Sequence, residues 1–432
     1  MLVLLLTGIG CVRLAFGRGW HEMRAFLLTY SVCVFVGGLA QSYALATFGD
    51  VQSTTDAFTF FRWISPTPPF TTMASLPPAI NSRLAVVIWQ QVYRVAWWAG
   101  LKFGPYTSVM FNALVVGLSG SLAVRTAREI FGDDAWRLRR VGTLFSLCGL
   151  FILFGAVLIR DCFVLFFNLV VLWSIIRWLV RPSVRRFLLG LGIILLSAWA
   201  MSYLRIQNVF LLIVYGFMAL LLRFFLGRRT LVWHSIVIVL MGALLVSTSY
   251  LMSRFQSVRD MQARAISHYS ALAADTHEAD SLGMKLIINQ PFPIRLVLGS
   301  GALMINPVPL WANFKRESGE YHWIKGYHGI YQVAVMPLLL AGIIFAIRLF
   351  LRDRDSGAPW VFLFAYLFVG VLGVAATSLE QRHLAQFMPS VMILAALPDT
   401  RKATVRNHVH VLAGLWIVLV LLVHLAWAVL KG

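Results

Sequence analysis

The sequence predicts an all-α protein, a polytopic bundle of transmembrane helices, from three observations. Of the 432 residues, 59% are hydrophobic and only 12% are charged, whereas soluble domains are about 45–50% apolar and about 25% charged. The mean hydropathy of the chain is +0.79. Apolar runs of the length needed to cross a bilayer, about 20 residues, recur along the chain. This composition excludes a disordered chain, a collagen, a disulfide scaffold and a soluble α/β enzyme.

About twelve spans are expected, within a range of 11–13, and they form one integral membrane domain over 1–432. The first and eleventh spans are short enough to be re-entrant. The first also lacks a basic region before its apolar run, which argues against a cleaved signal peptide. The expected spans are 1–16, 25–47, 105–124, 141–158, 162–178, 187–203, 208–224, 235–252, 329–349, 358–377, 384–398 and 409–429.

The connections between these spans alternate in charge. Six short connections hold twenty of the 37 Lys and Arg residues. Because Lys and Arg are enriched in short cytoplasmic loops, these six connections are placed in the cytoplasm and both termini outside. Orientation therefore explains much of the net charge of +20, and nucleic acid is not an expected partner. The six connections are 17–24, 125–140, 177–186, 223–234, 348–357 and 399–408.

Two long segments, 48–104 and 253–328, fall on the outer side, where long ordered loops commonly carry function. Residues 79–98 of the first predict an amphipathic helix lying in the membrane interface, with Trp97 and Trp98 as aromatic anchors. Its polar face carries Arg83, Gln90 and Arg94. Simple anchoring is the preferred interpretation of this helix, and contact with substrate is the alternative.

Asp50 and Asp56 follow the second span directly and are the candidate catalytic residues. Two carboxylates at a membrane boundary can serve as a general base and a second, orienting or metal-binding acid. The alternative is that both are solvated loop acids, with Asp56 capping a short helix that starts at Ala57. A second acidic cluster, 275–280, has the atoms to bind a divalent ion but is equally typical of a solvated helix start.

Three short outer connections place arginines at the mouth of the bundle. Arg is suited to bidentate binding of phosphate, so these connections predict a site for a lipid-linked phosphate or pyrophosphate. The alternatives are snorkelling toward lipid headgroups and ion pairs with neighbours such as Asp161, the preferred interpretation for Arg160. The candidate phosphate-binding residues are Arg205, Arg382, Arg160, His383 and Gln207.

Several signals are absent from the sequence. The four cysteines form no CxxC pair, so neither a metal knuckle nor a disulfide is indicated. No Walker loop, GxGxxG after a strand, HExxH or GxSxG is found, so the sequence gives no sign of an ATPase, a nucleotide-cofactor enzyme, a zincin or a serine hydrolase. None of the 17 acids falls in the middle of a span, which argues against a proton-coupled transporter.

Read together, these features resemble the bacterial membrane glycosyltransferases of the GT-C class, which include enzymes that use polyprenyl-phosphate sugars and are related to protein mannosyltransferases. The resemblance covers most of the chain in layout but little of it in strict motif. The residues that carry it are Asp50, Asp56, the run 103–106, Asn112, the run 125–132, Arg160, Asp161, the run 203–205, and the run 380–384 leading to Pro389.

The resemblance implies transfer of a sugar from a polyprenyl-linked donor to a glycan or lipid acceptor at the outer face of a bacterial inner membrane. It implies that Asp50 or Asp56 is the catalytic base and that Arg205 and Arg382 bind the donor phosphate. The six-residue separation of Asp50 and Asp56 differs from the adjacent acids or DxD of some members, which leaves dependence on a divalent metal open. The large C-terminal soluble domain that could bind an acceptor is also missing.

Two other functions remain open at this point. An O-antigen or exopolysaccharide polymerase would use similar lipid-linked substrates and outer arginines but would need no catalytic acid. A transporter or flippase for a lipid-linked saccharide would form no glycosidic bond. For each of these functions, membrane lipids are expected partners of the protein.

Overall fold

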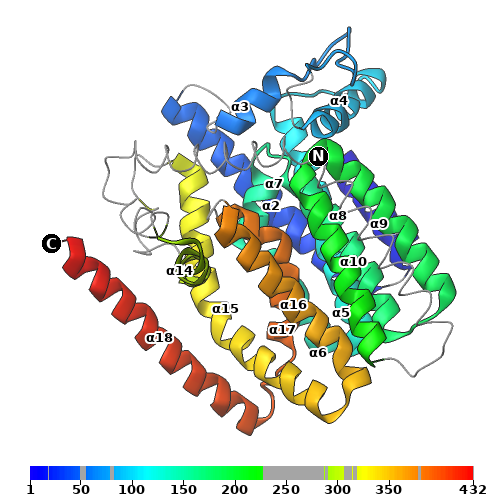
Figure 1. Ribbon diagram of the computed structural model, residues 1–432. Coiled ribbons are helices and arrows are strands. Elements are labelled where there is room, and N and C mark those ends of the chain that lie inside the picture. The colour runs from blue at the N-terminus through cyan, green and yellow to red at the C-terminus, as the bar shows by residue number, and fades with distance from the viewer. Residues whose placement is uncertain are drawn as a thin grey trace. The chain divides into compact units, whose positions relative to one another are not determined.

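The computed structural model describes residues 1–17, 19–48, 55–77, 82–226, 287, 290–305, 314, 319–377 and 381–431. Every regular element among these residues is a helix, which confirms the all-α prediction for this part of the chain (Figure 1). The chain divides into two compact units, Met1–Leu212 with Asn313–Tyr331 (unit 1) and Ile213–Ala312 with Gln332–Gly432 (unit 2). Both units contain helices long and apolar enough to cross a membrane. That residues 1–432 form one integral membrane domain stays a prediction.

Seven helices in the described residues are long and apolar enough to cross a membrane, or eight if one bent pair counts as a span. Helices able to span a membrane are therefore present as expected, while the number twelve stays a prediction. The expected span 235–252 lies outside the described residues. The seven lie in α2 (Trp20–Phe48), α5 (Tyr106–Phe131), α8 (Asp161–Val180), α9 (Val184–Leu204), α15 (Gly319–Arg352), α16 (Arg354–Thr377) and α18 (Ala403–Lys431).

Four shorter elements occupy three other expected spans. The expected spans 1–16 and 208–224 lie on α1 (Leu2–Phe16) and α10 (Ile206–Leu226), whose apolar lengths are below those of the seven. The expected span 384–398 is not one helix. It is divided between a 3₁₀ helix, η4 (Gln381–Phe387), and α17 (Met388–Ala396).

Helix α5 is the centre of unit 1, packed against α2 and α8 and mostly buried. Small residues let the backbones of α5 and α2 approach each other, as is usual between membrane helices. A Cβ on Gly120 of α5 would lie 2.9 Å from the Oγ1 atom of Thr29 on α2. The Thr29 hydroxyl in turn shares a 2.8 Å hydrogen bond with Ser146. Polar side chains between these helices are thus paired with each other.

The expected fourth span, 141–158, is broken rather than continuous. It consists of α6 (Ala135–Ser146) and α7 (Gly149–Ala156), which meet at an angle of 55°. A short non-helical segment, 157–159, follows α7. The prediction of one helix was wrong here because apolar composition does not reveal hydrogen bonds from distant side chains, which hold the break as described below.

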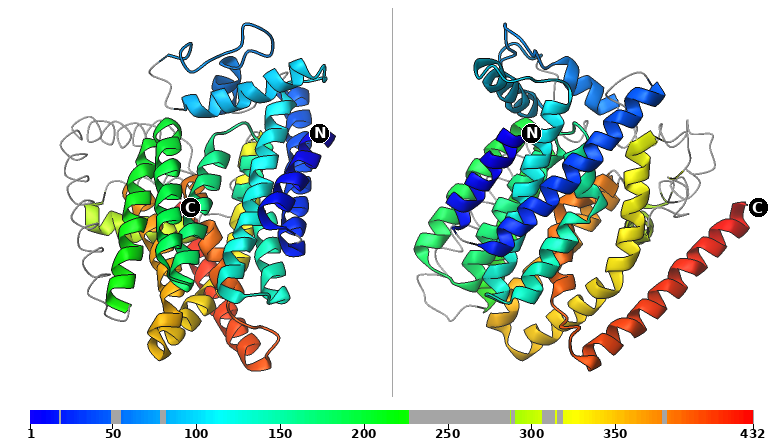
Figure 2. Two further views of the ribbon diagram at one scale, coloured as in Figure 1. Left: turned by 90° about the vertical axis from the view of Figure 1, so that its right-hand side faces the viewer. Right: turned by 180° about the vertical axis from the view of Figure 1, so that it is seen from behind.

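Two short helices, α3 (Thr55–Arg62) and α4 (Arg83–Trp98), lie at one end of unit 1 (Figures 1 and 2). We call this end, which includes Arg160 at the start of α8 and Arg205 at the end of α9, the α4 end. Helix α4 matches the amphipathic helix expected over 79–98. It does not lie with its polar face open, because residues 63–77 cover that face.

The contacts of the polar face of α4 are specific. Gln90 is fully buried, and its side chain exchanges two hydrogen bonds with the backbone of Ser65, of 2.8 and 2.6 Å. The Nε atom of Arg83 donates to the Pro77 carbonyl at 3.1 Å. The Arg94 guanidinium lies over the rings of Phe70 and Trp98. The face predicted to meet lipid headgroups therefore binds a segment of the same chain.

In unit 2, α14 (Phe292–Ile305) packs on α16, which also contacts η4 and α17. Aromatic rings fill this core, with Tyr366 of α16 contacting both Tyr215 of α10 and Phe387 of η4. Helix α15 belongs to unit 1 up to Tyr331 and to unit 2 from Gln332. It begins at Gly319, ten residues before the expected start of its span at 329. The last part of the outer segment 253–328 is therefore the first part of a membrane-length helix.

Candidate functional site

The α4 end of unit 1 brings together charged residues that are distant in sequence. Asp161 opens α8, and Arg205 follows the last residue of α9. The Nη1 atom of Arg205 donates to the Oδ1 atom of Asp161 at 3.0 Å, and the two side chains are only 14% and 9% exposed. A largely buried ion pair of this kind fixes the direction of the guanidinium.

Arg160 makes a different contact from the one the sequence favoured. Its guanidinium donates to the hydroxyl of Ser82, the N-cap residue of α4. The ion pair of Asp161 is with Arg205, not with its neighbour in sequence. Arg160 thus connects the start of α8 to the start of α4, and Arg205 connects the same turn of α8 to the end of α9.

Asn112, a fully buried residue of α5, binds the non-helical segment 157–159 that leads to Arg160 and Asp161. Its Nδ2 atom donates to the carbonyls of Val157 and Ile159, at 3.0 and 3.1 Å. Its Oδ1 atom accepts from the Nε1 atom of Trp89 at 2.7 Å. One amide therefore satisfies two backbone carbonyls after α7 and orients the central aromatic residue of α4.

Trp89 connects the elements of the α4 end. Its ring lies 5.5 Å from that of Phe60 on α3 and 5.6 Å from that of Phe163 on α8, measured between centroids. Helix α3, which carries Asp56, is thereby tied to the helix that carries Asp161. Tyr93 lies one turn after Trp89 on α4, and its hydroxyl donates to the Gly104 carbonyl at 2.9 Å. Burial raises the pKa of this hydroxyl.

The two candidate acids differ in what the structure describes. Asp56 is exposed and lies in the first turn of α3, where a carboxylate interacts favourably with the helix dipole. The short helix expected to start at Ala57 is present and begins at Thr55. Asp50 lies outside the described residues, as does the acidic cluster 275–280.

The remaining candidates lie in other elements. Arg382 and His383 are half-buried residues of η4 in unit 2. Gln381, just before them, is buried and donates to the Oε1 atom of Gln332 at 2.9 Å. Gln332 in turn donates to the carbonyls of Leu303 and Met304, each at 3.0 Å. Gln207 lies in the first turn of α10, and its side chain is outside the described part.

Among the described residues, no group of three or more His, Cys, Asp or Glu side chains is placed to hold a metal ion. The four cysteines are free thiols, in agreement with the sequence.

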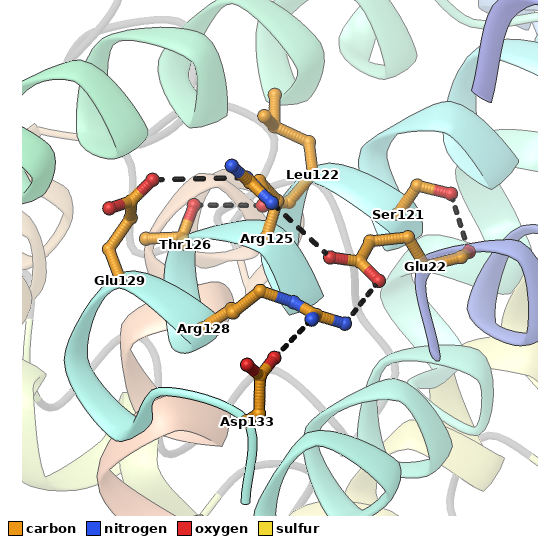
Figure 3. Close-up of polar contacts among 8 residues, drawn as sticks. All are labelled: Glu22, Ser121, Leu122, Arg125, Thr126, Arg128, Glu129 and Asp133. Atoms are coloured by element: carbon orange, nitrogen blue, oxygen red, sulfur yellow. Dashed lines mark hydrogen bonds and ion pairs between the residues drawn. The ribbon is translucent and has the colours of Figure 1, made fainter. Parts of the chain in front are cut away.

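The opposite end of unit 1 holds a charge cluster that the sequence reasoning missed (Figure 3). Glu22, expected in the cytoplasmic connection 17–24, is fully buried in the first turn of α2. Its carboxylate lies 2.8 Å from Nη2 of Arg128 and 4.0 Å from Nη1 of Arg125, both on α5. Arg128 also pairs with Asp133, whose side chain is 85% exposed. The signal was present as an acid and two arginines in connections assigned to the same membrane side.

No protein-family model matches the chain. Comparison with curated proteins also gives no match. The function of the α4 end is therefore argued from its residues.

Proposed function

We propose that this chain is a bacterial inner-membrane glycosyltransferase of the GT-C class, with about twelve spans and the α4 end facing outward. It transfers a sugar from a polyprenyl-phosphate or polyprenyl-pyrophosphate donor to a glycan or lipid acceptor. The support for this proposal is the cluster of Arg160, Asp161 and Arg205 at the same end of unit 1 as α3 and its Asp56.

In the proposed mechanism, the phosphate of the donor binds at Arg160 and Arg205. Asp161 holds the Arg205 guanidinium in one orientation, so little reorganisation accompanies binding. An acid after the second span, Asp56 or Asp50, takes the proton of the acceptor hydroxyl. The acceptor oxygen forms its bond to the anomeric carbon as the bond from that carbon to the phosphate oxygen breaks. The leaving phosphate keeps the electron pair and is stabilised by the arginines.

The direct test uses purified protein in lipid nanodiscs with radiolabelled polyprenyl-phosphate hexoses and a panel of glycan and lipid acceptors. Arg205→Ala should lower kcat/KM by about 100-fold, the cost of losing one charged donor at developing negative charge. Arg186→Ala is the matched control, because Arg186 lies near the other end of α9 and donates to the Arg181 carbonyl. A kcat/KM of Arg205→Ala as high as that of Arg186→Ala would contradict the proposal.

Asn substitution of Asp50 and Asp56, singly and together, separates this function from a polymerase. A base hypothesis requires one of the variants to lose the pH dependence and most of the rate of transfer. Full activity in the double variant would favour the polymerase, which needs outer arginines but no acid.

A transporter or flippase for a lipid-linked saccharide is the second candidate, and the broken span α6–α7 favours it. Discontinuous membrane helices often line substrate sites in transporters. Movement of labelled lipid-linked sugar across liposomes by the purified protein, with no new glycosidic bond, would support transport and overturn the enzymatic proposal.

A further inference from the structure

Along the sequence, the break between α6 and α7 lies midway between Ala135, where α6 starts, and Arg160, at the α4 end. Phe145, Cys148 and Leu150 at the break are fully buried, whereas the side chain of Leu147 is 42% exposed. A break in a membrane helix leaves backbone carbonyls without their helical partners, and these carbonyls must be satisfied from elsewhere in the protein. The first part of α15 supplies the missing partners.

Two tyrosine hydroxyls of α15 donate to carbonyls at the end of α6. Tyr327 donates to Leu147 at 2.9 Å and Tyr331 donates to Leu144 at 2.8 Å. Between them, α15 packs directly on the break: a Cβ on Gly149 would lie 2.6 Å from the Cβ and 2.8 Å from the Cα of His328. Only glycine at 149 permits this approach.

His328 is fully buried within the membrane-length part of α15. Its Nδ1 atom lies 3.9 Å from the Sγ atom of Cys148, and its ring stacks on that of Tyr331. The Nε2 atom is buried and has no hydrogen-bond partner among the described residues. The sequence reasoning found no acid at membrane depth, but it assigned His328 to the outer segment. The structure places a buried, ionisable imidazole in a helix that is long and apolar enough to cross a membrane.

We infer that His328 and the α6–α7 break form a proton-binding site within the membrane, and that protonation of His328 releases the break from α15. The inference is independent of the proposed glycosyl transfer. An ionisable side chain at membrane depth is costly, and such residues usually carry a function that involves charge.

The direction of the effect follows from the neighbours of His328. Within the part of the chain that the structure describes, the titratable groups beside it are Cys148 from the break and Tyr327 and Tyr331 from α15, all uncharged donors or weak acceptors. The nearest basic residue in sequence is Lys325, one turn earlier on α15. None of these groups stabilises an imidazolium, so a proton on His328 creates a buried, uncompensated charge. Opening of the break hydrates that charge, and acid therefore favours the open form.

The experiment measures the accessibility of Cys148 in lipid nanodiscs. One variant keeps Cys148 alone, with the other three cysteines replaced by Ala, and a reference variant keeps only the exposed Cys11. Maleimide reacts with thiolates, so the rate at Cys148 is divided by the rate at Cys11 at each pH. We expect this ratio to rise about fivefold from about pH 7.5 to about pH 5, the range in which histidine titrates.

Two histidine variants decide the cause. His328→Gln keeps the ratio low at every pH because its amide takes no proton, with His328→Asn as the second choice if that variant does not fold. His322→Gln, which removes an exposed imidazole from the same helix, behaves like the parent. A ratio that is flat with pH in the parent, or that rises equally in His328→Gln, would overturn the inference.

Discussion

Arg128 binds two carboxylates whose surroundings are opposite. Glu22 is fully buried and Asp133 is 85% exposed, yet both contact the same guanidinium (Figure 3). Loss of one partner of a buried pair leaves an uncompensated charge, whereas an exposed pair contributes little. The energetic weight of the cluster is therefore expected to lie on Glu22.

Glu22→Gln should lower the stability of the protein by about 3 kcal/mol, because two arginines lose their buried counter-ion. Asp133→Asn should change it by less than about 1 kcal/mol. Thermal unfolding of the purified protein in detergent measures both. Similar losses in the two variants would show that burial does not decide the strength of these pairs.

Asn112 is expected to matter more than another buried asparagine, Asn168 of α8. Asn112→Ala removes the partners of the Trp89 indole and of the Ile159 carbonyl, at about 1–3 kcal/mol for each buried polar group left unsatisfied, while the Val157 carbonyl keeps its bond from the Ile159 backbone N–H. Asn168 donates to Val164 of its own helix, so Asn168→Ala should cost less. The unfolding temperatures of the two variants provide the comparison, and a smaller loss for Asn112→Ala would contradict the role assigned to it.

At the scale of elements, the approach of α15 to the α6–α7 break gives a prediction about two glycines. Gly149→Ala places a methyl group against the backbone of His328 and should destabilise the protein, because backbone atoms cannot rotate away. Gly192→Ala on α9 has open space around it and should be neutral or stabilising by up to about 1 kcal/mol. Equal unfolding temperatures in the two variants would contradict the close packing of α15 on the break at Gly149.

For helix α4 the sequence predicted the element but not the partners of its polar face, and its place in the membrane interface stays a prediction. Its position and amphipathic pattern are visible in the sequence, since Arg83, Gln90 and Arg94 share one face. The partner of that face is not visible, because Ser65, Phe70 and Pro77 reach it through loop geometry that no periodicity encodes. Polarity predicts only that a face needs polar partners, and these can be water, lipid or the chain itself.

For the molecule as a whole, residues that the charge of the connections assigns to the same side of the membrane contact one another in unit 1. Glu22 meets Arg125 and Arg128 at one end, and Ser82 and Arg160 meet at the other. Which end faces the cytoplasm stays a prediction based on the basic connections.

Impermeant maleimide on intact spheroplasts tests that orientation in a variant that lacks Cys11. A cysteine introduced at the exposed Thr67, in the segment that covers α4, should be labelled from outside. A cysteine introduced at Asp133 should be labelled only after permeabilisation. The reverse pattern would invert the assignment and move the proposed site to the cytoplasmic face.

The sequence predicted the helical class and most membrane-length helices, because apolar length is a local property of the chain. It also singled out Arg160, Arg205 and Asp56, which the structure places at one end of unit 1. It did not predict that Asp161 pairs with Arg205, that Asn112 binds the carbonyls after α7, or that His328 is buried. Each of these depends on contacts between residues far apart in the chain, for which single-sequence patterns carry no information.

The hydroxyls of Tyr327 and Tyr331 have a consequence for biogenesis. They are 180 and 187 residues later in the chain than the carbonyls they satisfy. During synthesis the broken helix therefore enters the bilayer long before its hydrogen-bond partners exist. Its carbonyls must rely on water, the insertion machinery or temporary neighbours until α15 emerges from the ribosome. Truncated chains that end before Gly319 would retain this defect, and membrane quality-control proteases would have a reason to remove them.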